Sequence, residues 1–435
     1  MDRIQAYLGK RIDNSSLVFF RMGFGLLLCL ECWGAIATGW VSKNLVNPKF
    51  TFNYIGFDWI QYLVGEGMYI YFIVMGLLGV LIMLGLFYRP AIILFTIMWS
   101  ISYLAQKTSY NNHYYLLILI SGLMSFSPAH KNRSCDVLWR GVTRDDKCSY
   151  AYIFIFIAQI GIVLLYASFN KMHGDWFRAE AISIWFSSKS DYPIIGGLLS
   201  EKWFQLIVAW GGIIFDGTII FLLFFKRTRT LGVVLSFLFH LFNSFVFQIG
   251  IFPYLSLLFI VFFYPGEKIR KLFFKDTATV VDQPHKLGKT PILLISAYLL
   301  IQLLLPIRHY VIPGDVVWTG EGKKMSWRMM LKARRGIISF RVENPESGEK
   351  VKVKLNDYLY PKQRARMSVN NDMIWQFSQR LKEEYLKKGW KSVKIFVDAK
   401  VKINKGSFRT LIDPKTDLAA AKWSYLWHSK WKLSP

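Results

Sequence analysis

Long apolar runs separated by short polar segments fill roughly the first two thirds of the chain. A helix that crosses a bilayer needs about 20 consecutive apolar residues, and nine runs reach or approach that length. They lie at 16–39, 67–87, 91–106, 113–128, 150–170, 204–225, 231–250, 253–265 and 291–307. The run at 253–265 is short for a complete span, so we expect it to be tilted or incomplete. The pattern predicts an all-α polytopic membrane bundle of about nine spans over residues 1–307.

The pattern changes after Ile307, because residues 308–435 are polar and basic and alternate like a small folded domain. Strand-like or helix-like runs occur at 338–342, 351–355, 371–388, 393–403 and 408–412. The first two flank a turn-rich segment at 344–348, which is typical of a β-hairpin, and the third has helical spacing and ends at Gly389. We therefore expect a C-terminal α+β domain that rests on the outer ends of the spans.

Lysine and arginine are unevenly divided between the two sets of connecting segments. With the N-terminus in the cytoplasm, the cytoplasmic segments carry eighteen basic residues and the opposite ones carry seven. Cytoplasmic loops of membrane proteins are enriched in lysine and arginine, so we expect this orientation. An odd number of spans then places Lys171 and the C-terminal domain on the extracytoplasmic side, which is the periplasmic side in a bacterium.

Two of the extracytoplasmic segments, 41–66 and 171–202, mix aromatic with polar residues. One interpretation is that they lie along the membrane surface as aromatic belts in contact with lipid. The other is that they cover a cavity between the spans. The pattern alone leaves both interpretations open.

The composition supports a membrane protein and changes the meaning of its charge. Hydrophobic residues make up 53% of the chain and aromatic residues 17%, while the formal net charge is +26. The basic residues lie between the apolar runs and in the C-terminal domain, so membrane topology accounts for most of them and a nucleic-acid partner is not expected. The four cysteines have no neighbouring cysteine or histidine pair that would complete a metal site. Glycine-rich nucleotide loops are also missing, so we expect neither a metal nor a nucleotide, and any chemistry would use a diffusible apolar cosubstrate.

Several polar side chains lie within the predicted spans or at their ends, where a charged group costs roughly 2.5–3.5 kcal/mol unless it has a partner or a task. They are Arg21, Glu31, Asn112, His113, Asp216, His240 and Asn243. Most have a structural explanation: Asp216 can tie helices together or meet a basic partner, and Arg21 can reach the cytoplasmic head groups. His113 differs, because it opens a span on the side of Lys171 and follows an asparagine that can fix its tautomer.

Lys171 ends the apolar run 150–170, and Gly174, Asp175 and Trp176 follow at once. A lysine at this depth can extend its ammonium to the head groups, which is a structural role. Alternatively, a half-dry pocket would remove its hydration and favour the neutral amine, which is a usable base. A base and an imidazole on one rim of a bundle are typical of a proton-transfer site.

These residues lie in longer blocks that resemble the vitamin K-dependent γ-glutamyl carboxylase family over nearly the whole chain. The blocks are Phe20-Arg21-Met-Gly-Phe-Gly25, Lys107-Thr-Ser-Tyr-Asn-Asn-His113-Tyr, Lys171-Met-His-Gly-Asp175-Trp176, Phe215-Asp216, Phe239-His240-Leu-Phe-Asn243, Ser326-Trp327-Arg-Met-Met330 and Ile412-Asp413-Pro414. Several blocks at matched spacing make this resemblance specific, unlike a single short motif.

The resemblance implies an integral-membrane enzyme that couples two reactions. Reduced vitamin K reacts with O2 and becomes its epoxide, and the strong base formed on the way allows CO2 to be added to the γ-carbon of a peptide glutamate. In that scheme Lys171 deprotonates the quinol, His113 supports deprotonation of the glutamate, and Asn112 holds the imidazole. The candidates for cofactor binding lie in the same blocks and are His240, Asn243, Asp216, Trp176 and Arg21. The implied partners are a glutamate-containing peptide or protein, a lipid quinol (menaquinol or phylloquinol) and membrane lipid.

Two features depart from the animal members of the family. Asn170 precedes Lys171, where the animal enzymes carry two adjacent lysines, so the retained lysine is the one expected to act. The chain also stops soon after Trp423, without their long C-terminal portion. The short form favours a bacterial member that uses menaquinol, and it makes propeptide-directed recognition doubtful.

Two other hypotheses remain open from the sequence. The protein could be a quinol epoxidase without the carboxylation step, because that step depends on how the C-terminal domain places a peptide. It could also be a non-catalytic membrane receptor or transporter, which would be expected to cluster polar residues at the bilayer centre. The position of His113 and Lys171 at one rim favours catalysis.

Overall fold

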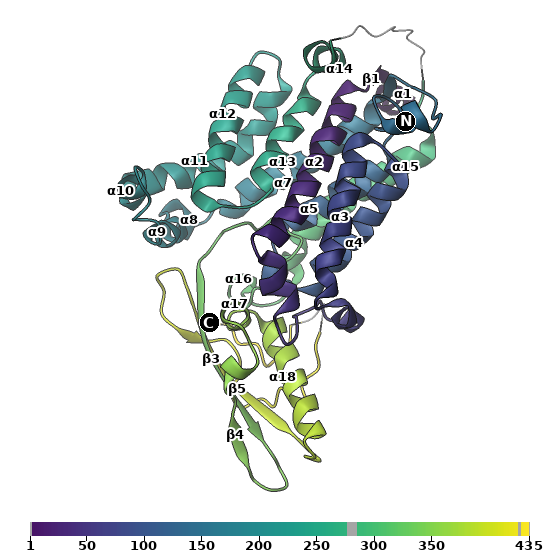
Figure 1. Cartoon of the computed structure of the whole chain (residues 1–435). Helices are drawn as coiled ribbons and strands as arrows, with labels where there is room; N and C mark the ends of the chain where they lie inside the picture. Colours follow the sequence, from purple (N-terminus) through teal and green to yellow (C-terminus); the bar gives the residue numbers. More distant parts are fainter. Residues whose placement is uncertain (1, 276–284, 425–427, 435) are drawn as a thin grey trace.

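Seven helices among the described residues are long and apolar enough to cross a membrane. The computed structural model describes residues 2–275, 285–424 and 428–434. The seven helices are α2 (Ser15–Ala37), α3 (Gly67–Leu84), α4 (Tyr88–Ala105), α7 (Tyr150–Lys171), α11 (Lys202–Phe224), α12 (Arg229–Phe242) continued by the π-helical η4 (Asn243–Phe247), and α15 (Lys289–Ile307) continued by η7 (Arg308–Val311). Figure 1 shows this bundle at one end of the molecule and an α+β domain at the other. The predicted fold class is thereby confirmed.

The other two predicted spans are shorter helices. Residues 113–128 form α5 (Asn112–Phe126), and residues 253–265 form α13 (Phe252–Phe259) continued by the 3-10 helix η5 (Ile260–Phe263). At 1.5 Å per residue, the 15 residues of α5 extend about 22 Å, which is less than the ~30 Å thickness of a bilayer's hydrocarbon core. The run at 253–265 is short, as expected, whereas the run at 113–128 was expected to cross the membrane; seven helices among the described residues have the required length.

Glycines allow α2 and α3 to approach each other closely. A methyl group added to Gly25 would lie 2.3 Å from the backbone nitrogen of Met83, and one added to Gly79 would lie 2.7 Å from that of Cys29. Neither clash can be relieved without moving a backbone. Small residues at helix contacts are common in membranes, where the surrounding lipid is as apolar as the helices and close packing supplies the attraction.

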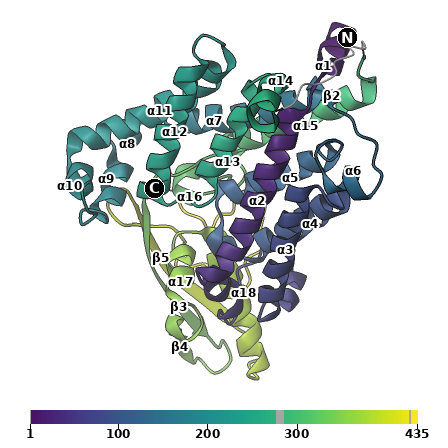
Figure 2. The same ribbon diagram turned by 45° about the horizontal axis from the view of Figure 1, so that its top comes forward.

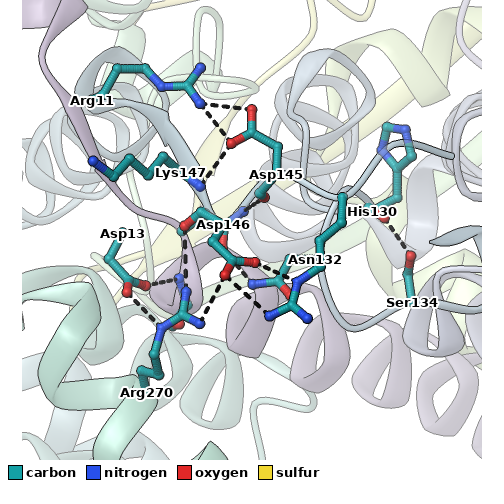
Figure 3. A network of polar contacts seen from close by, with 12 residues as sticks. Arg11, Asp13, His130, Asn132, Ser134, Asp145, Asp146, Lys147 and Arg270 are labelled. Atoms are coloured by element: carbon teal, nitrogen blue, oxygen red, sulfur yellow. Dashed lines mark hydrogen bonds and ion pairs between the residues drawn. The ribbon is translucent and has the colours of Figure 1, made fainter. Parts of the chain in front are cut away.

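Buried ion pairs tie together the end of the bundle remote from the C-terminal domain (Figure 3). There β1 (Arg11–Asp13) pairs antiparallel with β2 (Lys147–Ser149), which brings the N-terminal segment beside the segment that enters α7. The guanidinium of Arg270 donates to Asp13 at 2.7 Å and lies 3.5 Å from a carboxylate oxygen of Asp146. Three segments far apart in the sequence are thus held together by one buried arginine.

The C-terminal domain is built on a four-stranded antiparallel sheet in the order β4-β3-β5-β6. Its main elements are β3 (Arg334–Glu343), β4 (Lys350–Lys352), α17 (Pro361–Met367), α18 (Asn371–Lys387), β5 (Lys394–Ile403) and β6 (Arg409–Thr410). Val342 pairs with Val351 across the predicted hairpin, and Gly348 in its turn has a φ of +73° that favours glycine. Phe377 and Leu381 of α18 are fully buried in the domain's apolar cluster. The predicted hairpin, helix and strand pair are confirmed.

The segment 41–66 contributes to the core of the C-terminal domain. Phe50 and Phe52 are buried there, and Phe50 stacks on Phe377 of α18 with 6.1 Å between ring centroids. Neither of the two interpretations drawn from the sequence anticipated this, because both placed the aromatic side chains against lipid or over a cavity. Trp59 and Tyr62 of the same segment remain exposed.

The segment 171–202 folds into three short helices against the bundle. They are α8 (Gly174–Phe177), α9 (Glu180–Ser187) and α10 (Gly196–Ser200), and Figure 2 shows them gathered at one end of α11. Trp176 and Phe186 are buried in an apolar cluster shared with α11. This segment therefore encloses the end of α7, where Lys171 lies.

Candidate active site

The side chain of Lys171, the last residue of α7, turns into the protein. The residue is 9% exposed, and its ammonium binds the carboxylate of Asp216 on α11, a residue that is 5% exposed. The Lys171 Nζ atom also lies 5.5 Å from the centroid of the Trp176 ring, and the Trp176 indole N–H donates to the carbonyl of Ala209 at 2.8 Å. The ammonium of Lys171 is therefore held inside the protein and does not extend to the head groups.

A chain of aromatic contacts connects Phe215, the residue before Asp216, to His113. The ring of His240 on α12 lies 5.6 Å from that of Phe215 on α11. His240 also lies 5.9 Å from Phe252 of α13, and Phe252 stacks on His113 at 4.1 Å with the two rings 19° from parallel. Side chains from α5, α7, α11, α12 and α13 therefore meet in one region.

The Nδ1 atoms of His113 and His240 are both buried and have no hydrogen-bond partner. A buried polar atom without a partner costs about 1–3 kcal/mol, so two of them in an aromatic environment need an explanation. A largely apolar ligand with hydroxyl or carbonyl oxygens would supply a partner for Nδ1 of His240, which leaves Nδ1 of His113 for a second ligand. A quinol has this combination of ring and oxygens, so the residues present fit the cofactor implied by the sequence resemblance.

Asn112, the first residue of α5, is connected by hydrogen bonds to the C-terminal domain. Its Oδ1 atom accepts from the hydroxyl of Tyr110 at 2.8 Å, and that hydroxyl accepts from the backbone N–H of Met325 at 2.8 Å. The expected support of His113 by Asn112 does not act through Nδ1 of the imidazole, which is unpartnered. The structure thus brings Asn112 beside His113 but gives its carboxamide a different partner.

Of the remaining predicted cofactor ligands, Arg21 lies away from this region and Asn243 follows His240 along the chain. Arg21 lies near the opposite end of the bundle from Lys171, where its guanidinium donates to the carbonyls of Ala129 at 2.9 Å and Arg133 at 2.7 Å. These bonds give Arg21 a structural role, and its expected role in cofactor binding stays a prediction. Asn243 begins η4, directly after α12, and its side chain is buried.

Residues 323–330 of the C-terminal domain, which we call the covering loop, lie over the ends of α5 and α7. The ring of Trp327, a residue that is 1% exposed, packs 5.2 Å from that of Tyr115 on α5 and belongs to the apolar core of the bundle. Asn170, beside Lys171, donates its amide to the carbonyl of Ser326 at 3.5 Å. The covering loop therefore touches both the α5 side and the α7 side of the site.

Two ammonium groups share one carboxylate next to the covering loop. Asp372, in the first turn of α18, binds Lys324 at 2.7 Å and Lys107 of the bundle at 3.0 Å. Burial by itself would raise the pKa of Asp372, but the two cations together hold this pKa well below its ordinary value. Burial also lowers the pKa of Lys107 to about 8. This cluster joins the C-terminal domain to the outer end of the bundle.

We expect the Asp372 cluster to weaken in acid. The folded pKa of Asp372 lies below the value of about 3.9 for an unfolded aspartate, so its ion pairs contribute stability above that pH and lose it as the pH falls further. Asp372→Asn should therefore be less stable than the wild type near neutral pH, by up to about 3 kcal/mol, and the difference should shrink toward about pH 3. Thermal unfolding of the detergent-solubilised protein, followed by tryptophan fluorescence, measures the difference. A gap between the two proteins that stays constant across this pH range would contradict the expectation.

Sequence reasoning did not identify Phe252 or Tyr110 as parts of the site. Phe252 resembles many other apolar residues in the bundle, and only the fold places it between the two histidines. Tyr110 lies inside the block 107–114 that contains His113, so the sequence resemblance could have identified it. Its partner Met325 is 215 positions away, and no periodicity reports such a contact.

Comparisons with known families agree with this architecture. Residues 10–267 match the HTTM domain, so the protein belongs to the class of integral membrane proteins with that helical domain. Residues 288–435 match the lumenal domain of vitamin K-dependent gamma-carboxylase, and no solved structure matches the chain. The chain therefore belongs to the vitamin K-dependent gamma-carboxylase family, and its C-terminal domain is extracytoplasmic. The resemblance found in the sequence blocks is confirmed.

Proposed function

We propose that this protein couples the oxygenation of a reduced lipid quinone, menaquinol in a bacterium, to the γ-carboxylation of glutamate in a peptide. O2 and CO2 are the other reactants. The bound quinol supplies, on reaction with O2, a base strong enough to remove a γ-proton from glutamate. The observation that carries the proposal is the buried Lys171–Asp216 pair beside Phe215, a residue whose ring is linked through those of His240 and Phe252 to His113.

The Lys171–Asp216 pair supports a base that can become neutral without exchange with water. Burial removes much of the hydration that stabilises an ammonium and a carboxylate. The neutral state of the pair, an amine beside a protonated carboxyl, is therefore closer in free energy to the charged state than it would be in water. A proton that passes from the Lys171 ammonium to Asp216 leaves the amine lone pair free to accept a proton from a hydroxyl of the quinol. In this scheme Asp216 serves the base, whereas the sequence suggested a role in cofactor binding.

His113 is suited to act on the glutamate. Phe252 fixes the plane of its imidazole by stacking, and the unpartnered Nδ1 atom can bond to a carboxyl oxygen of the substrate. Asn112 supports this role, because Tyr110 occupies its Oδ1 atom and its NH2 group is left to donate to a substrate oxygen.

The aromatic residues around His240 suit a quinone ring. Phe215 stacks on Phe239 with 3.8 Å between centroids, and His240 lies edge-on to both. Flat π faces and a histidine nitrogen match a ring system that carries two oxygens. Exclusion of water by these side chains would protect a strong base from being quenched.

We also propose that the N-terminus lies in the cytoplasm. The C-terminal domain is extracytoplasmic, and the N-terminal segment lies at the other end of the bundle (Figure 1). The excess of lysine and arginine in the segments at that end supports the same orientation.

Mass spectrometry of a glutamate-containing peptide tests the proposed function. The purified protein is incubated with the peptide, chemically reduced menaquinone, O2 and bicarbonate, and the peptide and the quinone are analysed together. We expect one carboxyl group to be added to glutamate and the quinone epoxide to form. Oxidised menaquinone and a peptide with glutamine in place of glutamate are the matched controls. Epoxide without carboxylation would identify a quinol epoxidase, and neither product would favour a receptor or transporter.

A further inference from the structure

The stretch that leads into His113 is bound by the C-terminal domain at three points. Lys107 lies 3.0 Å from Asp372, and the hydroxyl of Ser109 accepts from the ammonium of Lys362 at 2.9 Å. The third contact is the bond from the backbone of Met325 to the hydroxyl of Tyr110. Residues 107–110 thus have their conformation set by another domain, two residues before α5 begins.

The contact at Tyr110 differs from the other two because the same hydroxyl is also bonded to Asn112 at the start of α5. Its hydroxyl accepts from Met325 and donates to Oδ1 of Asn112, each at 2.8 Å. A phenol has one hydrogen to donate, so the two bonds fix its orientation. The carboxamide of Asn112 is therefore oriented by a backbone atom of the covering loop.

The covering loop holds a conformation that its surroundings must impose. Met325 and Trp327 have φ values of +55° and +54°, in the left-handed region that residues other than glycine rarely adopt. Burial of Trp327 among the bundle helices and the bond from Met325 to Tyr110 hold it in place. The position of Met325 relative to Tyr110 is consequently well defined.

We propose that Tyr110 is a positioning residue for glutamate carboxylation. Its hydroxyl links the backbone of the covering loop to Asn112, so the position of the loop sets the orientation of the Asn112 carboxamide. The inference rests on the proposed function. Quinol deprotonation by Lys171 occurs on the α7 side of the site, where Tyr110 has no bond, so Tyr110 acts on one of the two coupled reactions.

The test is the ratio of quinone epoxide formed to glutamate carboxylated. In Tyr110→Phe we expect epoxide formation near the wild-type rate and a roughly tenfold fall in carboxylation, because a small misplacement of a reacting group lowers the rate strongly. The ratio should therefore rise about tenfold. Loss of folded protein would lower both products together and leave the ratio unchanged, so a merely structural role does not produce this result.

Tyr71→Phe is the matched control, since it also removes a tyrosine hydroxyl, one that donates to the carbonyl of Met98 at 2.7 Å in the bundle. It should keep the wild-type ratio.

Hydrogen exchange of the intact protein gives a readout that does not depend on activity. In Tyr110→Phe the amide of Met325 loses its acceptor, and we expect it and the amides of 112–115 to exchange faster than in Tyr71→Phe. A ratio equal to that of Tyr71→Phe, or unchanged exchange at 112–115, would overturn the proposal. If the wild type carboxylates no peptide, the proposed function fails, and the exchange at 112–115 still decides whether Tyr110 transmits the position of the loop.

Discussion

Replacement of Lys171 by alanine is expected to lower the rate of quinone epoxide formation by about 10²–10⁴-fold, which is the contribution typical of a positioned proton acceptor. Asp216 would remain, but a carboxylate is a far weaker base than an amine and cannot take the proton of a quinol hydroxyl. Carboxylation should fall with epoxidation, because the base that acts on glutamate arises from the oxygenated quinone. Chromatography of the quinone after reaction with O2 measures the epoxide.

The single substitution leaves the Asp216 carboxylate buried without a partner, which costs about 3–5 kcal/mol. The double variant Lys171→Met with Asp216→Asn removes both charges and should be about as stable as the wild type while remaining inactive. Lys202→Ala alters an exposed lysine at the start of α11 and should keep wild-type activity. A primary amine added to Lys171→Ala should restore part of the epoxide yield. Wild-type epoxidation in the folded double variant would refute the assignment of Lys171.

Replacement of His113 by alanine is expected to reduce carboxylation by about 10²–10⁴-fold while epoxide continues to form. The imidazole is held against Phe252, its Nδ1 atom is unpartnered, and it belongs to α5, whereas Lys171 and Asp216 belong to α7 and α11. Loss of the ring should therefore disable the glutamate half of the reaction and spare the quinol half. Incorporation of labelled bicarbonate into a peptide, measured beside the epoxide, separates the two.

His309→Ala is the matched control for this prediction. His309 is also buried near the outer end of the bundle, but its Nδ1 atom is bonded to the carbonyl of Pro306 at 2.8 Å. This variant should keep both activities. Bicarbonate incorporation at the wild-type level in His113→Ala would remove His113 from the mechanism, and an equal loss of both products would point to a role shared with Lys171.

The order of the helices and the elements of the C-terminal domain could be predicted from the sequence, because each depends on a local pattern. Long apolar runs indicate helices that face lipid or the protein core, and the alternation of apolar and polar residues indicated β3 and β5. The bounds of α5 were also close to the predicted run 113–128, because Asn111 caps the helix by accepting from the backbone of Tyr114 and the helix ends at Phe126 after 15 residues. Hydrophobicity alone did not show that a helix of this length is short for crossing a bilayer.

The partners of the candidate residues could not be predicted, because they come from distant parts of the chain. Lys171 and Asp216 were each selected for being expensive in a membrane, but nothing in the sequence pairs two residues 45 positions apart. Arg21 was selected by the same rule and proved to bind backbone carbonyls. The free-energy cost of a polar side chain in a membrane identifies residues that need a partner. The identity of that partner comes from the fold.

We expect the ion pairs around Arg270 to limit where the bundle can open. They fasten one end of the bundle, while a folded domain sits on the other. A scaffold fixed in this way can part most easily along its sides, between neighbouring helices that face the hydrocarbon. A fat-soluble molecule dispersed in the bilayer arrives from that direction and need never cross water, whereas a peptide would have to approach from the aqueous end, past the covering loop.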